Sequence, residues 1–241
     1  MSRSNPQDQN NPNPSTRWYE WNGEAGVVKF YDKADKKTIN VVSDFQFILL
    51  DQLGGVSGWH ELSKSGIYSN EVRDTRQDTL IVKAFKGGVL AEGLYKDIKD
   101  KVNSQGGAFT TNLYIAIKID NELQIASLKF KGAALGAWME FSKENRAHLY
   151  TMAIKIVGVT EGKKGRVIFR TPRFALAPVS VETDQIAVGL DAELQAWLSG
   201  YLKRNTRERV DTHVRDEDVT PTPPQQDEEH GAPFDADSIP F

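Results

Sequence analysis

The sequence of 241 residues contains no cysteine, which excludes disulfide frameworks, thiolate nucleophiles and zinc sites of the cysteine-rich type. It also lacks any run of about 18 apolar residues, the length that a membrane-spanning helix requires. The N-terminal stretch MSRSNPQDQNNPNP has no apolar segment of the kind found in secretion signals. These absences predict a protein that stays in the compartment where it is made, and a cytoplasmic location is expected.

The residue patterns of common catalytic sites are missing as well. The four histidines are scattered and form no His-x-x-x-His pair. In the stretch GGVSGWH, the glycine after Ser57 comes one place too early for a G-x-S-x-G nucleophile elbow, so a glycine-rich loop is the preferred interpretation. Neither a phosphate-binding loop nor a dinucleotide fingerprint occurs, and Asp235 and Asp237 are too sparse to hold a metal well. No catalytic, cofactor or metal site is expected.

What the sequence does have is a separation of charge along the chain. Residues 17–207 carry 27 Lys+Arg against 22 Asp+Glu, a net charge of +5. Residues 208–241 carry 2 basic and 10 acidic residues, a net charge of −8. This asymmetry is typical of a polyanion-binding domain with an interaction tail. The alternative is a solubilising tail on an ordinary domain, and charge alone does not decide between them.

Composition divides the chain into three parts. Residues 1–16 are rich in Pro, Asn and Gln and contain no aromatic residue, so a disordered arm is expected there. Residues 205–241 are expected to form a disordered acidic linker and an interaction tip. Residues 17–204 are expected to fold as one domain.

Alternation of apolar and polar residues predicts that this domain is mainly β. In residues 113–119 the odd positions are aliphatic, so Tyr114 and Lys118 are expected on the opposite, outer face. The same alternation predicts strands at 126–131 and 151–156. Further strands are expected at 26–31, 43–51, 79–85 and 166–175, and helices at 89–102, at 132–145 and from an N-cap at Asp191 onward. A β-barrel or sandwich core with helical inserts follows from this order.

Basic and aromatic residues recur together in the predicted strands and loops. Lys and Arg neutralise phosphates with release of counterions, and aromatic rings offer faces on which unstacked bases lie. The candidate contacts to nucleic acid are Lys29, Tyr31, Trp59, Tyr68, Lys83, Tyr114, Lys118, Lys129, Lys131, Lys155, Arg166, Arg170 and Arg173. The competing interpretation is structural. Strand aromatics such as Phe85 would then belong to the core, residues 163–165 would be a solvated hairpin turn, and Trp18, Tyr19 and Trp21 would anchor the edge of the domain.

The last nine residues are PFDADSIPF, preceded by a stretch rich in Pro, Gln and acids. This order resembles the C-terminal tip of bacterial single-stranded DNA-binding proteins. The resemblance implies an oligonucleotide-binding (OB) barrel that binds single strands and a tip that recruits replication, recombination and repair proteins. It assigns Phe241 to a hydrophobic pocket of the partner, Pro240 and Ile239 to flanking apolar contact, and Asp235 and Asp237 to a basic rim.

The resemblance has two departures. Ser238 stands where the bacterial tip usually has an acid, and the body does not resemble the bacterial domain, which is about half its size. The body is instead similar to the divergent single-stranded DNA-binding proteins of bacteriophages. This resemblance implies an elaborated OB-fold antiparallel β-barrel. We therefore expect non-catalytic, largely sequence-independent binding of single-stranded DNA in a bacterial host cell, with no cofactor. The alternatives are an adaptor or decoy that carries the tip without binding DNA, and a nuclease or annealing enzyme with an undetected site.

Overall fold

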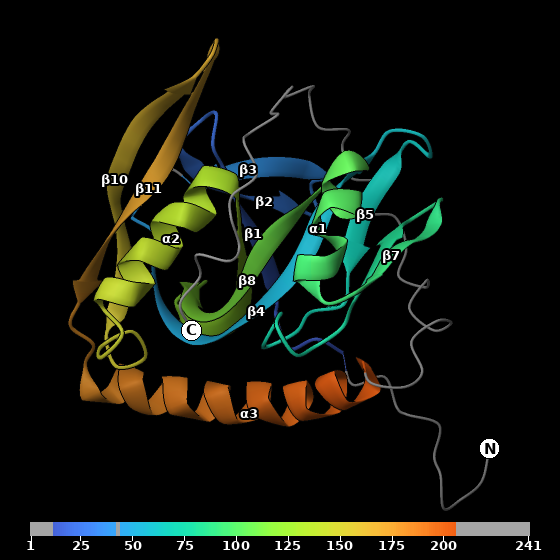
Figure 1. The fold of residues 1–241 in the computed structure, drawn as a ribbon. Coiled ribbons are helices and arrows are strands. Elements are labelled where there is room, and N and C mark those ends of the chain that lie inside the picture. Colours follow the sequence, from blue (N-terminus) through green and yellow to red (C-terminus); the bar gives the residue numbers. More distant parts are fainter. Residues whose placement is uncertain (1–11, 42–43, 206–241) are drawn as a thin grey trace, which may run out of the picture.

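The structure, a computed structural model, describes residues 12–41 and 44–205. In this part of the chain, one mixed sheet of eleven strands carries three helices (Figure 1). The strands are β1 (Arg17–Asn22), β2 (Val27–Asp32), β3 (Lys37–Val41), β4 (Gln46–His60), β5 (Ser65–Ser69), β6 (Leu80–Ala84), β7 (Gly88–Gly93), β8 (Gly107–Ile119), β9 (Glu122–Lys131), β10 (Ala153–Lys164) and β11 (Val167–Ala177). The helices are α1 (Tyr95–Ser104), α2 (Gly132–Glu144) and α3 (Val181–Asn205).

The strands follow the order β3-β2-β1-β9-β8-β4-β5-β6-β7, and β10 joins this path beside the first residues of β4. The pairs are antiparallel except β1 and β9, which run parallel. Among the described pairings, β3 and β7 at the two ends of the path do not pair with each other, so the sheet is open. The prediction of a mainly β protein with helical inserts is confirmed, whereas a closed barrel is not found.

Two helices cover one face of this sheet. Helix α2 packs its Trp138 into a cluster with Phe47, Leu113 and Leu128, and helix α1 packs its Val102 into a second cluster farther along the long strand β4. Both helices lie in front of the sheet in Figure 1. We call this side the α1/α2 face.

Helix α3 covers part of the opposite face, which we call the α3 face. Its Leu194, Trp197 and Leu198 pack against a cluster that includes Ile48 and Tyr114. The helix therefore crosses from β10 over β4 and β8, along the bottom of Figure 1. The central strands β4 and β8 are consequently buried on both sides.

Three predicted elements are placed differently. Helix α3 begins ten residues before the predicted N-cap at Asp191, because the Ser180 hydroxyl accepts a hydrogen bond from the Thr183 N–H at 3.2 Å and caps the earlier start. The predicted helix 89–102 is strand β7 followed by α1, since residues 88–93 pair with β6. The apolar residues of this stretch recur at helical spacing because Leu90 of β7 and Ile98 and Val102 of α1 all pack into one core cluster.

The predicted glycine-rich loop around Ser57 is also wrong. These residues lie inside strand β4, paired with β5 and β8. Glycine is needed there for close backbone approach: a Cβ on Gly58 would overlap the carbonyl oxygen of Gly106. Trp59 and Tyr68 therefore stand on paired strands rather than beside a loop.

Candidate nucleic-acid interface

Residue pairing across the sheet shows which candidate side chains share a face, because paired residues of neighbouring strands point to the same side. Lys29 pairs with Glu20, Glu20 with Lys129, and Lys129 with Asn112. Asn112 pairs in turn with Leu53, which packs beneath α3. This row of residues therefore lies on the α3 face.

The same test places ten of the thirteen candidate contacts on that face. They are Lys29, Tyr31, Trp59, Tyr68, Lys83, Tyr114, Lys118, Lys129, Lys131 and Lys155. Arg166 lies in the β10–β11 turn, and Arg170 and Arg173 lie on β11. Helix α3 crosses the shared face and separates Lys118 and Lys155 from the candidates nearer β1, β5 and β6.

The uncovered part of the face carries an exposed pair of aromatic rings. Trp18 on β1 is 48% exposed and Tyr31 on β2 is 42% exposed. The β1–β2 register pairs Tyr19 with Phe30, so Trp18 and Tyr31 are the next opposing pair on the other side of the two strands. The Lys33 Nζ atom lies 5.6 Å from the centroid of the Trp18 ring. Two accessible rings and a cation thus stand together.

A second aromatic group lies farther along the same face. Tyr68 on β5, 39% exposed, pairs with Lys83 on β6, and Phe85 follows with 63% exposure. Trp59, on the neighbouring strand β4, is only partly exposed.

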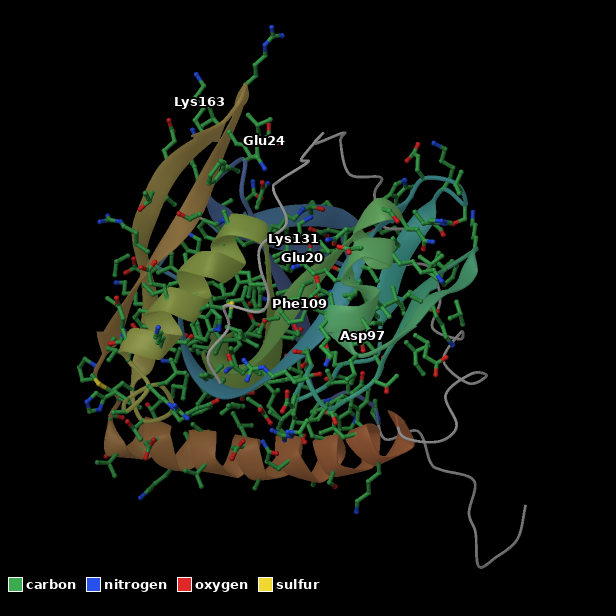
Figure 2. All side chains as sticks on the ribbon, viewed as in Figure 1. Glu20, Glu24, Asp97, Phe109, Lys131 and Lys163 are labelled. Carbon is green, nitrogen blue, oxygen red and sulfur yellow. The ribbon has the colours of Figure 1, made fainter. Side chains whose placement is uncertain are left out.

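Lysines of β9 lie between the two aromatic groups. Lys131 is exposed and Lys129 is partly buried. Figure 2 labels Lys131 together with Glu20, which comes from the neighbouring strand β1. We define the aromatic–lysine patch as the set Trp18, Lys29, Tyr31, Lys33, Tyr68, Lys83, Phe85, Lys129 and Lys131.

The prediction that Tyr114 lies on a contact surface is wrong. The alternation correctly placed its side chain opposite the aliphatic residues of β8, but α3 covers that side as well. Tyr114 is 1% exposed and its ring centroid lies 6.0 Å from that of Trp197. Its hydroxyl donates a hydrogen bond of 2.7 Å to the Glu71 carboxylate.

Glu71 links the covered and uncovered parts of the face. Burial raises the pKa of its carboxyl, and the Tyr114 hydroxyl and the charge of Lys129 offset this only in part. Its backbone N–H donates to the Tyr201 hydroxyl of α3 at 3.1 Å. Burial and the neighbouring Glu71 carboxylate raise the pKa of Tyr114 far above its usual value. Lys129 therefore already faces an internal acid, which weakens its case as a phosphate contact.

Three basic candidates have structural partners outside the patch or stand apart from it. Lys155 forms an ion pair of 2.8 Å with Asp44. Arg170 pairs with Glu161 at 3.2 Å and also donates to the Glu24 carbonyl, so it fastens the β10–β11 hairpin to the β1–β2 turn. Arg173, which is exposed, lies against Gly158.

The sequence interpretation missed Trp18 as a candidate contact, although a signal was present. Tyr19 and Trp21 share one phase and both are buried, whereas Trp18 has the opposite phase and is exposed. Treating the three aromatic residues as one cluster concealed that difference.

The predicted partner-binding residues Asp235, Asp237, Ile239, Pro240 and Phe241 lie outside the described residues. Within residues 12–41 and 44–205, no three His, Asp or Glu side chains are grouped so that they could hold a metal ion. No helix in these ranges has both the length and the apolar character needed to span a bilayer. A scan against protein-family models and searches of curated proteins and of solved structures find no significant match to this chain.

Proposed function

We propose that the protein binds single-stranded DNA without catalysis and with little dependence on base sequence. The observation that carries this proposal is the exposed Trp18–Tyr31 pair beside Lys33, on a sheet face that also presents Lys29 and Lys131. Single-stranded nucleic acid needs aromatic faces for its unstacked bases and cations for its phosphates. Aromatic side chains on an open sheet face provide such stacking in other nucleic-acid-binding proteins.

The exposure of these rings contrasts with the burial of the aromatic residues behind them. Tyr19, Trp21 and Phe47, on the other face of the same sheet, are each at most 7% exposed. Large aromatic residues gain most from burial, so an exposed pair rimmed by polar residues marks an interaction site. The neighbouring lysines favour a polyanion as the ligand.

For the fold we propose a divergent OB type. In an OB fold the first strand pairs with the second and the fourth, and a helix links the third to the fourth. Here β4 would correspond to the first strand, because it pairs with β5 as the second strand and with β8 as the fourth. Helix α1 directly precedes β8, as the OB helix precedes the fourth strand. The departure lies at β9, which pairs with β1 instead of closing a barrel against β6 or β7. The β1–β3 sheet would thus be an addition that extends the binding face.

For residues 227–241 we propose the recruitment of replication, recombination or repair proteins. Ile239, Pro240 and Phe241 supply a small apolar anchor, and Asp235 and Asp237 supply attraction to a basic rim. The support is the resemblance of this stretch to the bacterial tip. A cytoplasmic site of action in a bacterial host cell belongs to the same proposal.

The test is fluorescence anisotropy of a labelled oligo-dT with the full chain over a salt series. Trp18→Ala and Tyr31→Ala are each expected to weaken binding about 5- to 150-fold, because one stacked base contributes about 1–3 kcal/mol. Tyr150→Ala is the matched control, since Tyr150 is 50% exposed but lies outside the patch.

Each other outcome identifies an alternative. No binding by the unmodified protein would leave the adaptor interpretation. Unchanged affinity in the Trp18→Ala/Tyr31→Ala double variant would remove the patch as the site. Shortening of the oligonucleotide after addition of Mg²⁺ would indicate a nuclease.

A further inference from the structure

Strands β10 and β11 form a hairpin that projects beyond the rest of the folded chain (Figure 1). Its two strands pair without interruption from the Gly158–Arg173 pair to the Lys164–Val167 pair. The backbone N–H of Arg170 donates to the Gly23 carbonyl at 2.7 Å. The Trp21 indole N–H donates to the Arg170 carbonyl at 2.8 Å. We call residues 161–170 the arm. Its tip lies four residues past this anchor, or about 13 Å.

The tip of the arm carries three exposed cations, Lys163, Lys164 and Arg166. Figure 2 shows Lys163 near the end of the projection. The acid of the arm, Glu161, is paired with Arg170 at 3.2 Å. No ion pair found among the described residues involves any of the three tip cations. This concentration of positive charge favours a polyanionic ligand.

Exposed aliphatic side chains accompany these cations. Val167 is 38% exposed and pairs with Lys164, while Ile168 is 47% exposed and pairs with Lys163. The aromatic residue of the arm, Phe169, is not well placed for stacking, because its ring lies over Gly162 where a Cβ would overlap it. The arm thus offers apolar wedges and cations rather than the aromatic faces of the patch.

This chemistry fits the end of a duplex better than a free single strand. Aliphatic side chains pack against or between base pairs and partly unstack them, and Lys and Arg contact the adjoining phosphates. Pairing of arms from two copies is less favourable, since a two-fold contact between tips would bring their like charges together.

We propose that the arm binds the junction between single- and double-stranded DNA. Val167 and Ile168 point to opposite faces of the hairpin and form a wedge, one lying against the terminal base pair and the other against the first unpaired base. Lys163, Lys164 and Arg166 contact the duplex phosphates. The proposal rests on the proposed function, in which the aromatic–lysine patch holds the adjoining single strand.

The first experiment compares a duplex carrying a single-stranded dT tail with the same dT tail alone. The unmodified protein is expected to bind the tailed duplex about tenfold more tightly, since two half-exposed aliphatic side chains become buried. A 2-aminopurine in the terminal base pair is expected to brighten as it unstacks. Val167→Ser/Ile168→Ser is expected to abolish the brightening, to reduce the preference for the tailed duplex to the part that the three tip cations supply, and to leave dT binding within about twofold of the unmodified protein. Val181→Ser/Val188→Ser on α3 is the matched control, because both valines are exposed.

The second experiment replaces Lys163, Lys164 and Arg166 by Ser. For the tailed duplex, the slope of log K against log salt concentration is expected to become less negative by about 2.7, or about 0.9 for each lost phosphate contact. For the dT tail alone the slope is expected to stay unchanged. Lys101→Ser/Lys143→Ser, on α1 and α2, is the control.

Equal affinity for the tailed duplex and the tail would overturn the proposal, as would a junction preference that survives both arm variants. A dimeric unmodified protein and a monomeric Val167→Ser/Ile168→Ser variant, with DNA binding unchanged, would instead assign the arm to self-association. Failure to bind the dT tail at all would count against the proposed function. It would also overturn the arm proposal, because the patch would then hold no single strand beside the duplex.

Discussion

At the scale of single residues, Glu71 is a carboxyl group whose environment opposes its charge. Burial raises its pKa from the usual 4.5, while the Tyr114 hydroxyl and Lys129 stabilise the ionised form. The residue connects α3 with the aromatic–lysine patch, because its backbone N–H donates to the Tyr201 hydroxyl and its carboxyl feels the charge of Lys129. Its ionisation therefore affects the stability of this junction between elements.

The sign of the pH dependence follows from that shift. A carboxyl with a raised pKa binds its proton more tightly in the folded state, so folding stability falls as the pH rises from 4.5 through the raised pKa. Glu71→Gln keeps an acceptor for the Tyr114 hydroxyl and removes the charge. We expect this variant to lose that decline and to equal or exceed the unmodified protein in stability at pH 7, measured by urea unfolding between pH 4.5 and 8.

Glu182→Gln is the control, because hydrogen bonds at the start of α3 lower the pKa of that exposed carboxyl. It should not remove the decline that Glu71 causes. A Glu71→Gln profile as steep as that of the unmodified protein would show that Glu71 is not the group responsible.

At the scale of secondary-structure elements, α3 determines which part of the sheet can bind a ligand. Trp197 is 6% exposed, and its ring centroid lies 4.8 Å from the ring centroid of Tyr201 and 6.0 Å from that of Tyr114. This packing covers the middle of the α3 face and leaves the strands beyond it open. The helix is therefore expected to support the patch without contacting DNA.

Trp197→Ala should destabilise the protein by about 3–5 kcal/mol, as expected for truncation of a large buried side chain. The measurement is the midpoint and slope of denaturant unfolding. Val188→Ala in the same helix is the control, because Val188 is 64% exposed and its loss should change stability by less than about 0.5 kcal/mol. An equal effect of the two substitutions would mean that α3 is not packed through Trp197.

Alternation and turn chemistry account for the elements that could be predicted from the sequence. Strand β8 and helix α2 have regular apolar periods, and these local patterns match the contacts that the elements make. Alternation reports the phase of a side chain but not what covers it, which is why Tyr114 was placed on the surface. The Gly58–Gly106 contact and the early start of α3 depend on residues distant in sequence or on a cap outside the apolar pattern. Four lysines of the patch, Lys29, Lys83, Lys129 and Lys131, were predicted from the sequence, whereas Lys33 was not. The exposure of Trp18 required the register of β1.

At the scale of the whole molecule, basic and acidic charge are carried by different parts of the chain. The aromatic–lysine patch and the cationic arm belong to a body with a net charge of +5 over residues 17–207. Residues 208–241 carry a net charge of −8. An acidic segment joined to a basic surface raises the local concentration of a competing anion, so it should weaken DNA binding at low salt.

Removal of residues 208–241 tests this competition and leaves every described helix and strand intact, since α3 ends at Asn205. We expect the shortened chain to bind oligo-dT about three- to tenfold more tightly than the full chain at low salt, with the difference shrinking as salt screens the charges. A chain of full length in which the acids of this segment are replaced by Asn and Gln is the matched control for length, and it should behave like the shortened chain. Tighter binding by the shortened chain but not by the neutralised one would assign the effect to bulk rather than to charge. Weaker binding by both would show that these residues assist DNA binding instead of competing with it.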